Sequence, residues 1–175
     1  IGTIADLIQY RIKNEKTVER VSSCNLPTQH GDFQLVAYQD VIGNEMHLAL
    51  VKGEVDPEQP VAVRVHVQNT LHDALYGTIG RGWPLNDVMQ KVNDMGQGVI
   101  VFLRQSESPR QMVQNIEALI REENQEVHSD DLRTYGIGAQ ILADLGVHKM
   151  KLLSAPKKFH ALAGFGLEVV EYISD

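Results

Sequence analysis

The spacing of apolar residues predicts different structures in the two halves of the chain. In residues 31–51, GDFQLVAYQDVIGNEMHLALV, apolar runs lie on either side of IGNE, which is a β-hairpin signal. The run PVAVRVHV that follows places Val61, Val63 and Val65 on one face of a third strand. We therefore expect an antiparallel sheet early in the chain.

After residue 84 the pattern changes to alternating helices and strands. Apolar spacing predicts four helices, at residues 85–95, 109–123, 134–145 and 157–163. Short apolar runs predict three strands, at residues 99–104, 149–154 and 167–173. The first of these runs, VIVFLR, is continuous, as in strands that are buried on both faces. The sequence therefore predicts an α/β fold with α+β character, in which antiparallel strands come first and largely parallel pairing follows.

Two of the predicted helices have a clear apolar face. In the helix at 85–95 this face consists of Leu85, Val88, Met89 and Val92. In the helix at 109–123 it consists of Met112, Val113, Ile116, Leu119 and Ile120. Pro109 suits the first turn of the second helix, because backbone N–H groups have no acceptor within the helix there and proline lacks this N–H.

The first residues predict a helix that leads into a single domain. Apolar residues recur among charges from Ile4 to Val21, and Thr3 is suited to the N-cap position. We expect a connecting helix at residues 1–22 and one domain at residues 23–175, since 175 residues with 43% hydrophobic content can bury one core. The chain begins at Ile1 without a methionine, so we expect it to be a fragment of a longer polypeptide.

Charge, cysteine content and hydropathy indicate which partners and which cellular compartment to expect. The formal net charge is -7 and no run of Lys or Arg occurs, which argues against nucleic acid or a membrane surface as a partner. Cys24 is the single cysteine, so no intrachain disulfide can form, and we expect it to behave as a small apolar residue. No apolar run has membrane-spanning length, and we expect a cytoplasmic protein.

Several stretches together resemble GTP cyclohydrolase II, the zinc enzyme that opens the guanine ring of GTP at the start of riboflavin synthesis. They are LPTQHGDFQLVAYQD, HLALVKGEV, PVAVRVH, DLRTYGIGAQILADLGVHKMKLLS and APKKFHALAGFGLEVVEYI. The leading TIADLIQYRIKNEKTVERV resembles the connector of bifunctional proteins that also contain a dihydroxybutanone-phosphate synthase. The resemblance implies the GTP cyclohydrolase II-like fold, a fused or associated synthase domain and a homodimer.

The resemblance also implies that the family's zinc site is lost. In the family, three cysteines spaced C-x10-C-x-C follow the RVH strand, and three thiolates with one open position suit a catalytic zinc. The corresponding residues here are Asn69, Gly80 and Gly82, and none of them supplies a thiolate or an imidazole. We therefore expect no metal cofactor. One alternative stays open, a displaced site formed by His66, His72 and Asp73.

Two further family elements are altered. A motif similar to RQEGRGIGL contacts substrate phosphates in the family, and here it reads RQSESPRQM, residues 104–112. Glu107 stands where glycine and arginine would favour a phosphate, so its charge would repel a triphosphate. The family's loop before its Asp-x-Arg motif is shortened here to REENQEVHSD, in which we expect His128 to be an exposed loop residue.

Some family site residues remain. Asp131 and Arg133 match the family's proton acceptor and proposed nucleophile, and Arg64, Ser154 and Lys158 match positions that bind nucleotide. Arginine is a poor nucleophile without a base and a tightly held phosphate. A structural role is therefore preferred for the first pair, with Asp131 capping a helix that begins at Thr134 and Arg133 exposed.

Three hypotheses follow from these observations. The preferred one is a catalytically inactive domain retained for folding, dimerisation or regulation of a fused synthase. The second is an active GTP cyclohydrolase II with an atypical metal site, releasing formate, pyrophosphate and a diaminopyrimidine from GTP. The third is a sensor of nucleotides or pathway metabolites that binds GTP weakly through Arg64, Ser154 and Lys158.

Overall fold

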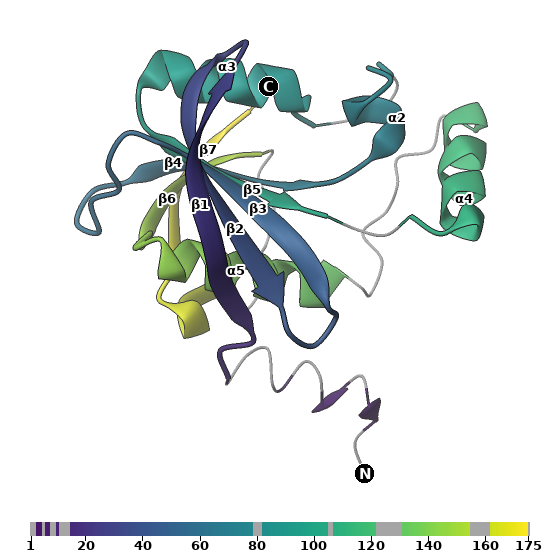
Figure 1. Ribbon diagram of the computed structural model, residues 1–175, viewed down its shortest axis with the longest axis horizontal. Helices are drawn as coiled ribbons and strands as arrows, with labels where there is room; N and C mark the ends of the chain where they lie inside the picture. The colour runs from purple at the N-terminus through teal and green to yellow at the C-terminus, as the bar shows by residue number, and fades with distance from the viewer. Residues whose placement is uncertain are drawn as a thin grey trace.

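A seven-stranded sheet with helices on both faces forms the centre of the molecule (Figure 1). The computed structural model describes residues 3–4, 6–7, 10, 15–78, 82–104, 107–121, 131–154 and 162–174, with the backbone alone at 131–133 and 163. The strand order is β1-β2-β3-β5-β4-β6-β7. In the described ranges no helix is both long enough and apolar enough to cross a membrane.

The first half of the sheet is antiparallel, as the sequence predicts. Strands β1 (Val18–Thr28), β2 (Gly31–Asp40) and β3 (Glu45–Lys52) pair in succession. The residues of the predicted hairpin turn, 41–44, connect β2 to β3. Strand β3 then pairs antiparallel with β5 (Gly98–Leu103), which lies next to it although it comes two strands later in the chain.

The second half is parallel, which confirms the predicted change of pairing. Strand β4 (Val61–Val67) lies between β5 and β6 (Lys149–Leu153) and is parallel to both, and β7 (Glu168–Ile173) pairs parallel with β6. The carboxyl ends of these four strands therefore meet at one edge of the sheet.

Each face of the sheet has its own apolar core. Helix α3 (Leu85–Met95) covers one face with the four residues predicted for its apolar side, Val88 and Val92 being fully buried. Helix α5 (Asp131–Asp144) and the 3-10 helix η1 (Leu162–Phe165) cover the other face. Strand β5 contributes Ile100 to the first core and Val101 to the second, so it is buried on both faces as its continuous apolar run predicts.

The connecting helix is shorter than predicted. Thr3 has the hydrogen bond of an N-cap, because its Oγ1 accepts from the Asp6 N–H at 3.1 Å. Residues 18–21, however, belong to β1 rather than to this helix, and the expected boundary at residue 22 falls inside the strand. The β1–β2 pairing and a Gln140 side chain that accepts the Thr17 and Val18 N–H groups at 2.8 and 3.2 Å stabilise the extended backbone.

Helix α5 is joined to the edge of the sheet by a second set of polar contacts. Asp144, at its last residue, accepts hydrogen bonds from Arg20 at 2.9 Å and from the Tyr38 hydroxyl at 2.7 Å. Burial raises the pKa of Asp144 and these hydrogen bonds lower it, with a net pKa below the ordinary value. The C-terminal end of α5 is therefore anchored to β1 and β2.

Helix α4 (Pro109–Ile120) lies away from the sheet (Figure 1). Ser108 is its N-cap and Pro109 is in its first turn, as predicted, with the Ser108 Oγ accepting from the Gln111 N–H at 3.1 Å. Its predicted apolar face is covered only in part, since Met112 and Leu119 are half-buried while Val113, Ile116 and Ile120 are exposed. The spacing was sufficient to predict an apolar face but not what would cover it.

The remaining differences concern helix starts and the cysteine. Helix α5 begins at Asp131, three residues before the predicted Thr134. Of the short helix predicted at 157–163, only the last residues lie in the described part, where η1 begins at Leu162. Cys24 is exposed on β1 rather than packed as an apolar residue, because β1 is an outer strand of the sheet.

Candidate functional site

The carboxyl edge of the parallel strands brings together several residues that the sequence singled out. Arg64 lies on β4, Ser154 directly follows β6, and Asn69 begins the segment after β4. Helix α5 begins with Asp131 and Arg133, whose side chains lie outside the described residues. In parallel α/β sheets, ligand sites form at this edge, outside the carboxyl ends of the strands.

Arg64 is a partly buried cation whose guanidinium is only partly satisfied by hydrogen bonds. Its Nη1 donates to the Leu153 carbonyl at 2.9 Å, and its buried Nε has no hydrogen-bond partner among the described residues. Burial lowers the pKa of the guanidinium, while the nearby Tyr135 opposes this effect. Ser154 is held close by, since its N–H donates to the Ile173 carbonyl at 3.0 Å on the adjacent strand.

Asn69, which the resemblance in sequence aligns with the family's first cysteine, is the N-cap of helix α2 (Thr70–Asp73). Its backbone is extended, and its side-chain oxygen accepts from the Leu71 and His72 N–H groups at 3.1 and 3.4 Å. Asparagine is among the preferred N-cap residues because it satisfies N–H groups that lack a partner within the helix. The side chain at this position is therefore used to begin a helix.

Gly82, which the resemblance in sequence aligns with the third cysteine, has a backbone conformation suited to glycine. Its φ of 105° lies in the region that residues with a side chain rarely adopt. A Cβ atom placed there would lie 3.6 Å from the Arg64 Nη2. Gly80, at the second position, lies outside the described residues.

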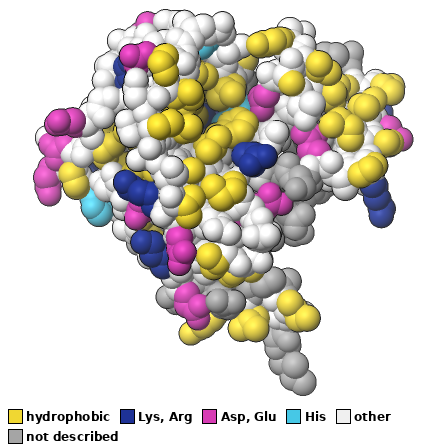
Figure 2. Space-filling model, viewed as in Figure 1, with side chains coloured by type: hydrophobic (Ala, Val, Ile, Leu, Met, Phe, Trp, Pro, Cys, Tyr) yellow, Lys and Arg dark blue, Asp and Glu magenta, His cyan; other side chains and the backbone are white. Residues whose placement is uncertain are grey.

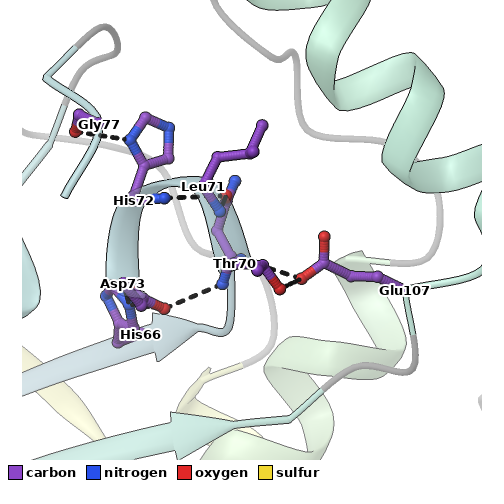
Figure 3. Close-up of polar contacts among 8 residues, drawn as sticks. His66, Thr70, Leu71, His72, Asp73, Gly77 and Glu107 are labelled. Carbon is purple, nitrogen blue, oxygen red and sulfur yellow. Dashed lines mark hydrogen bonds and ion pairs between the residues drawn. The ribbon is translucent and has the colours of Figure 1, made fainter. Parts of the chain in front are cut away.

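Asp73 joins this segment back to strand β4. Its carboxylate is 2.9 and 3.0 Å from His66 Nε2 and accepts from the Asn69 N–H at 2.9 Å (Figure 3). Burial would raise the pKa of Asp73, but the hydrogen bonds from His66 and Asn69 outweigh it and hold the pKa below its ordinary value. The His66 ring also stacks on Phe102, with centroids 5.7 Å apart.

The three residues of the alternative metal site do not converge. His72 Nδ1 lies 3.1 Å from the Gly77 carbonyl, and Figure 3 shows its ring directed away from His66 and Asp73. Within the described ranges, no group of three or more His, Cys, Asp or Glu side chains could hold a metal ion. The described geometry thus gives no support to a displaced zinc site.

Glu107 has a structural role that the sequence did not reveal. Its Oε1 accepts from the Thr70 N–H at 3.0 Å and the Thr70 hydroxyl at 2.7 Å (Figure 3). Its Oε2 accepts from Asn115 at 3.2 Å. Sequence reasoning considered only its charge towards phosphate. The contact joins residues 37 positions apart, so no local pattern indicated it.

Trp83, which follows Gly82, packs against the core beneath α3, and its Nε1 donates to the Ile173 carbonyl at 3.1 Å. The predicted site residue Lys158 and the predicted loop residue His128 lie outside the described residues. The roles given to Asp131 and Arg133 stay predictions, although both lie in the first turn of α5 rather than before it.

We predict that Asp73→Ala lowers the free energy of unfolding by about 1–3 kcal/mol at neutral pH, because partners in His66 and Asn69 are left unsatisfied. The pKa of Asp73 is lower in the folded protein than in the unfolded chain. The ionised carboxylate therefore stabilises the fold fully above the unfolded-state pKa, and this stabilisation is lost as the pH falls through the folded-state pKa. The difference from wild type should therefore shrink below about pH 4. Urea unfolding at several pH values measures this.

Glu58→Ala is the matched control, since Glu58 is an exposed carboxylate in a loop. It should change the free energy of unfolding by less than about 0.5 kcal/mol. Equal effects of the two substitutions at neutral pH would contradict the structural role of Asp73.

Comparisons with known proteins extend over nearly the whole chain. A 3,4-dihydroxy-2-butanone 4-phosphate synthase of Photobacterium phosphoreum is 41% identical over 99% of this chain and 48% of its own length. A riboflavin biosynthesis protein RibBA of Chlorobium phaeovibrioides is 38% identical over 98% of this chain and 44% of its own length. The chain thus spans about half the length of these curated relatives.

A solved structure and a family model give the same assignment. The crystal structure of RibBX, a two-domain 3,4-dihydroxy-2-butanone 4-phosphate synthase from A. baumannii, superposes with a TM-score of 0.70 at 40% identity, over 100% of this chain and 46% of that one. The model of the GTP cyclohydrolase II family matches residues 19–174, from strand β1 to the end of the sheet. This chain belongs to the GTP cyclohydrolase II family.

Proposed function

We propose that this chain is a GTP cyclohydrolase II domain that does not turn over GTP and that supports a dihydroxybutanone-phosphate synthase domain in the same polypeptide. The observation that carries the proposal is the use of Asn69 as a helix cap at the position of the family's first zinc cysteine. The family's reaction needs a zinc-bound water whose pKa is lowered towards neutrality. An amide and two glycines provide no thiolate for that metal.

Glu107 supports the same proposal from the phosphate-binding side. Its carboxylate is bonded to Thr70 and Asn115, so it is held in place where the family favours a phosphate. A fixed negative charge at this position opposes the binding of a triphosphate. Both the hydrolytic and the phosphate-binding elements are therefore replaced by groups with structural roles.

The names of the relatives favour a synthase as the supported activity. The Photobacterium relative is named a synthase alone, and the A. baumannii structure is described as a two-domain synthase. This chain matches less than half of each of these two proteins. The other half of each is long enough for a synthase domain, and the proposal places such a domain in the polypeptide of this chain too. Support through a homodimer is part of the proposal.

The purified protein should contain far less than one equivalent of zinc per chain and should release no formate from GTP. The reason is the absence of thiolate ligands at positions 69, 80 and 82. Metal analysis after incubation with zinc, followed by a formate assay, measures both properties. A GTP cyclohydrolase II that retains its three cysteines is the positive control. About one equivalent of zinc together with GTP-dependent formate would overturn the proposal.

Deleting residues 23–175 from the full-length protein should lower the activity of the synthase or change its oligomeric state. The expected cause is the loss of contacts between the two domains, because these contacts stabilise the fold of the synthase or its assembly into oligomers. Synthase turnover and mass in solution are the measurements. If the truncated synthase has unchanged turnover and the same number of subunits as the full-length protein, the supporting role is excluded.

A second candidate function is the binding of a nucleotide without turnover, and Arg64 favours it. A partly buried guanidinium whose Nε lacks a hydrogen-bond partner among the described residues is suited to an anion. Calorimetry with GTP should then show binding that Arg64→Ala abolishes and that the exposed-site control Arg110→Ala retains. No heat at millimolar GTP would exclude this candidate.

A further inference from the structure

Helix α4 leaves three of its apolar side chains exposed. Its single buried residue is the polar Asn115, which is 6% exposed. Val113, Ile116 and Ile120 are 52%, 43% and 77% exposed. In most amphipathic helices of globular proteins the apolar stripe faces the core. In α4 the side that faces the body carries the buried Asn115 with the half-buried Met112 and Leu119, and three other apolar residues are left on the exposed side.

Polar contacts hold α4 to the rest of the described structure. Asn115 donates to Glu107 at 3.2 Å and accepts from Gln111 at 2.9 Å, and Glu107 in turn bonds Thr70 at the start of α2. On a helix, positions 111 and 115 lie on one side and positions 113, 116 and 120 on the other. The exposed apolar residues therefore point away from the molecule.

The exposed side of α4 has the spacing of a helix-packing surface. Positions 113, 116 and 120 follow the i, i+3, i+7 pattern of one continuous stripe, which contains no charged residue. Figure 2 shows hydrophobic side chains gathered over α4 at the right of the molecule. A contiguous apolar surface of this kind is typical of a site that contacts another protein surface. The charged Glu117 borders this stripe, one helical turn from both Val113 and Ile120.

The size of this surface favours a tethered partner over a free one. Three side chains expose no more than a few hundred Å², whereas a stable interface between free proteins buries about 800 Å² on each partner. A domain in the same polypeptide has an effective concentration near the millimolar range, so a smaller contact is sufficient. The relatives contain about as much chain again as the part that this chain matches.

We propose that the apolar face of α4, formed by Val113, Ile116 and Ile120, docks onto the second domain of the same polypeptide. This inference rests on the proposed function, which places a synthase domain in that polypeptide. It adds the surface through which the two domains touch and the chemistry of the partner surface, which is an apolar groove that receives one helix face.

The test compares three forms of the full-length protein by hydrogen exchange of each domain and by mass in solution. They are the wild type, Ile116→Glu and the matched control Gln114→Glu, which adds the same charge to an exposed position off the stripe. Ile116→Glu should cause loss of protection in α4 and in one segment of the second domain, with unchanged mass. Gln114→Glu should keep both protected, and so should Ile116→Leu.

Protection of the β5 amides reports that the domain remains folded, because Ile116 is exposed and outside both cores. Equal exchange in Ile116→Glu and Gln114→Glu would overturn the proposal. A halved mass for Ile116→Glu would also overturn it, because the apolar face of α4 would then pack against a second copy of the chain. A full-length chain that contains no second domain would overturn it as well. GTP turnover with a docked α4 would instead contradict only the proposed function.

Discussion

Strand β5 is the constraint on which the rest of the structure depends, because it pairs antiparallel with β3 on one side and parallel with β4 on the other. It is the only strand among those described that joins the two kinds of pairing. Its side chains alternate between the core beneath α3 and the core beneath α5, so both layers require it. With β5 fixed, the carboxyl ends of four parallel strands meet at one edge, where Arg64, Ser154 and the segment after β4 lie.

Hydrogen bonds between side chains and backbone order the segment that follows β4. A structural zinc site contributes on the order of 10 kcal/mol to the fold of a small domain. A hydrogen bond contributes about 1 kcal/mol. The bonds of Asn69, Asp73 and Glu107 therefore order the segment through several weak contacts rather than one strong one. Hydrogen bonds can preserve a shape in this way, but they do not activate water.

Local patterns in the sequence predicted what depends on nearby residues. The hairpin at 41–44, the apolar side of α3 and the start of α4 at Pro109 all follow from spacing and capping rules over a few residues. The connecting helix was predicted to extend too far, to residue 22, because Gln140, more than 120 residues away, stabilises the extended backbone at the start of β1. The role of Glu107 and the direction of the α4 stripe were missed for the same reason, since each depends on residues distant in the sequence.

Helix α5 relates the residues that follow the connecting segment to the opposite edge of the sheet. Gln140 and Asp144, near its C-terminal end, bond Thr17 and Arg20. Its first residue is Asp131, and a helix of 14 residues is about 21 Å long. Because backbone hydrogen bonds fix the length of a helix, the contacts that order the start of β1 also set how far from them Asp131 lies.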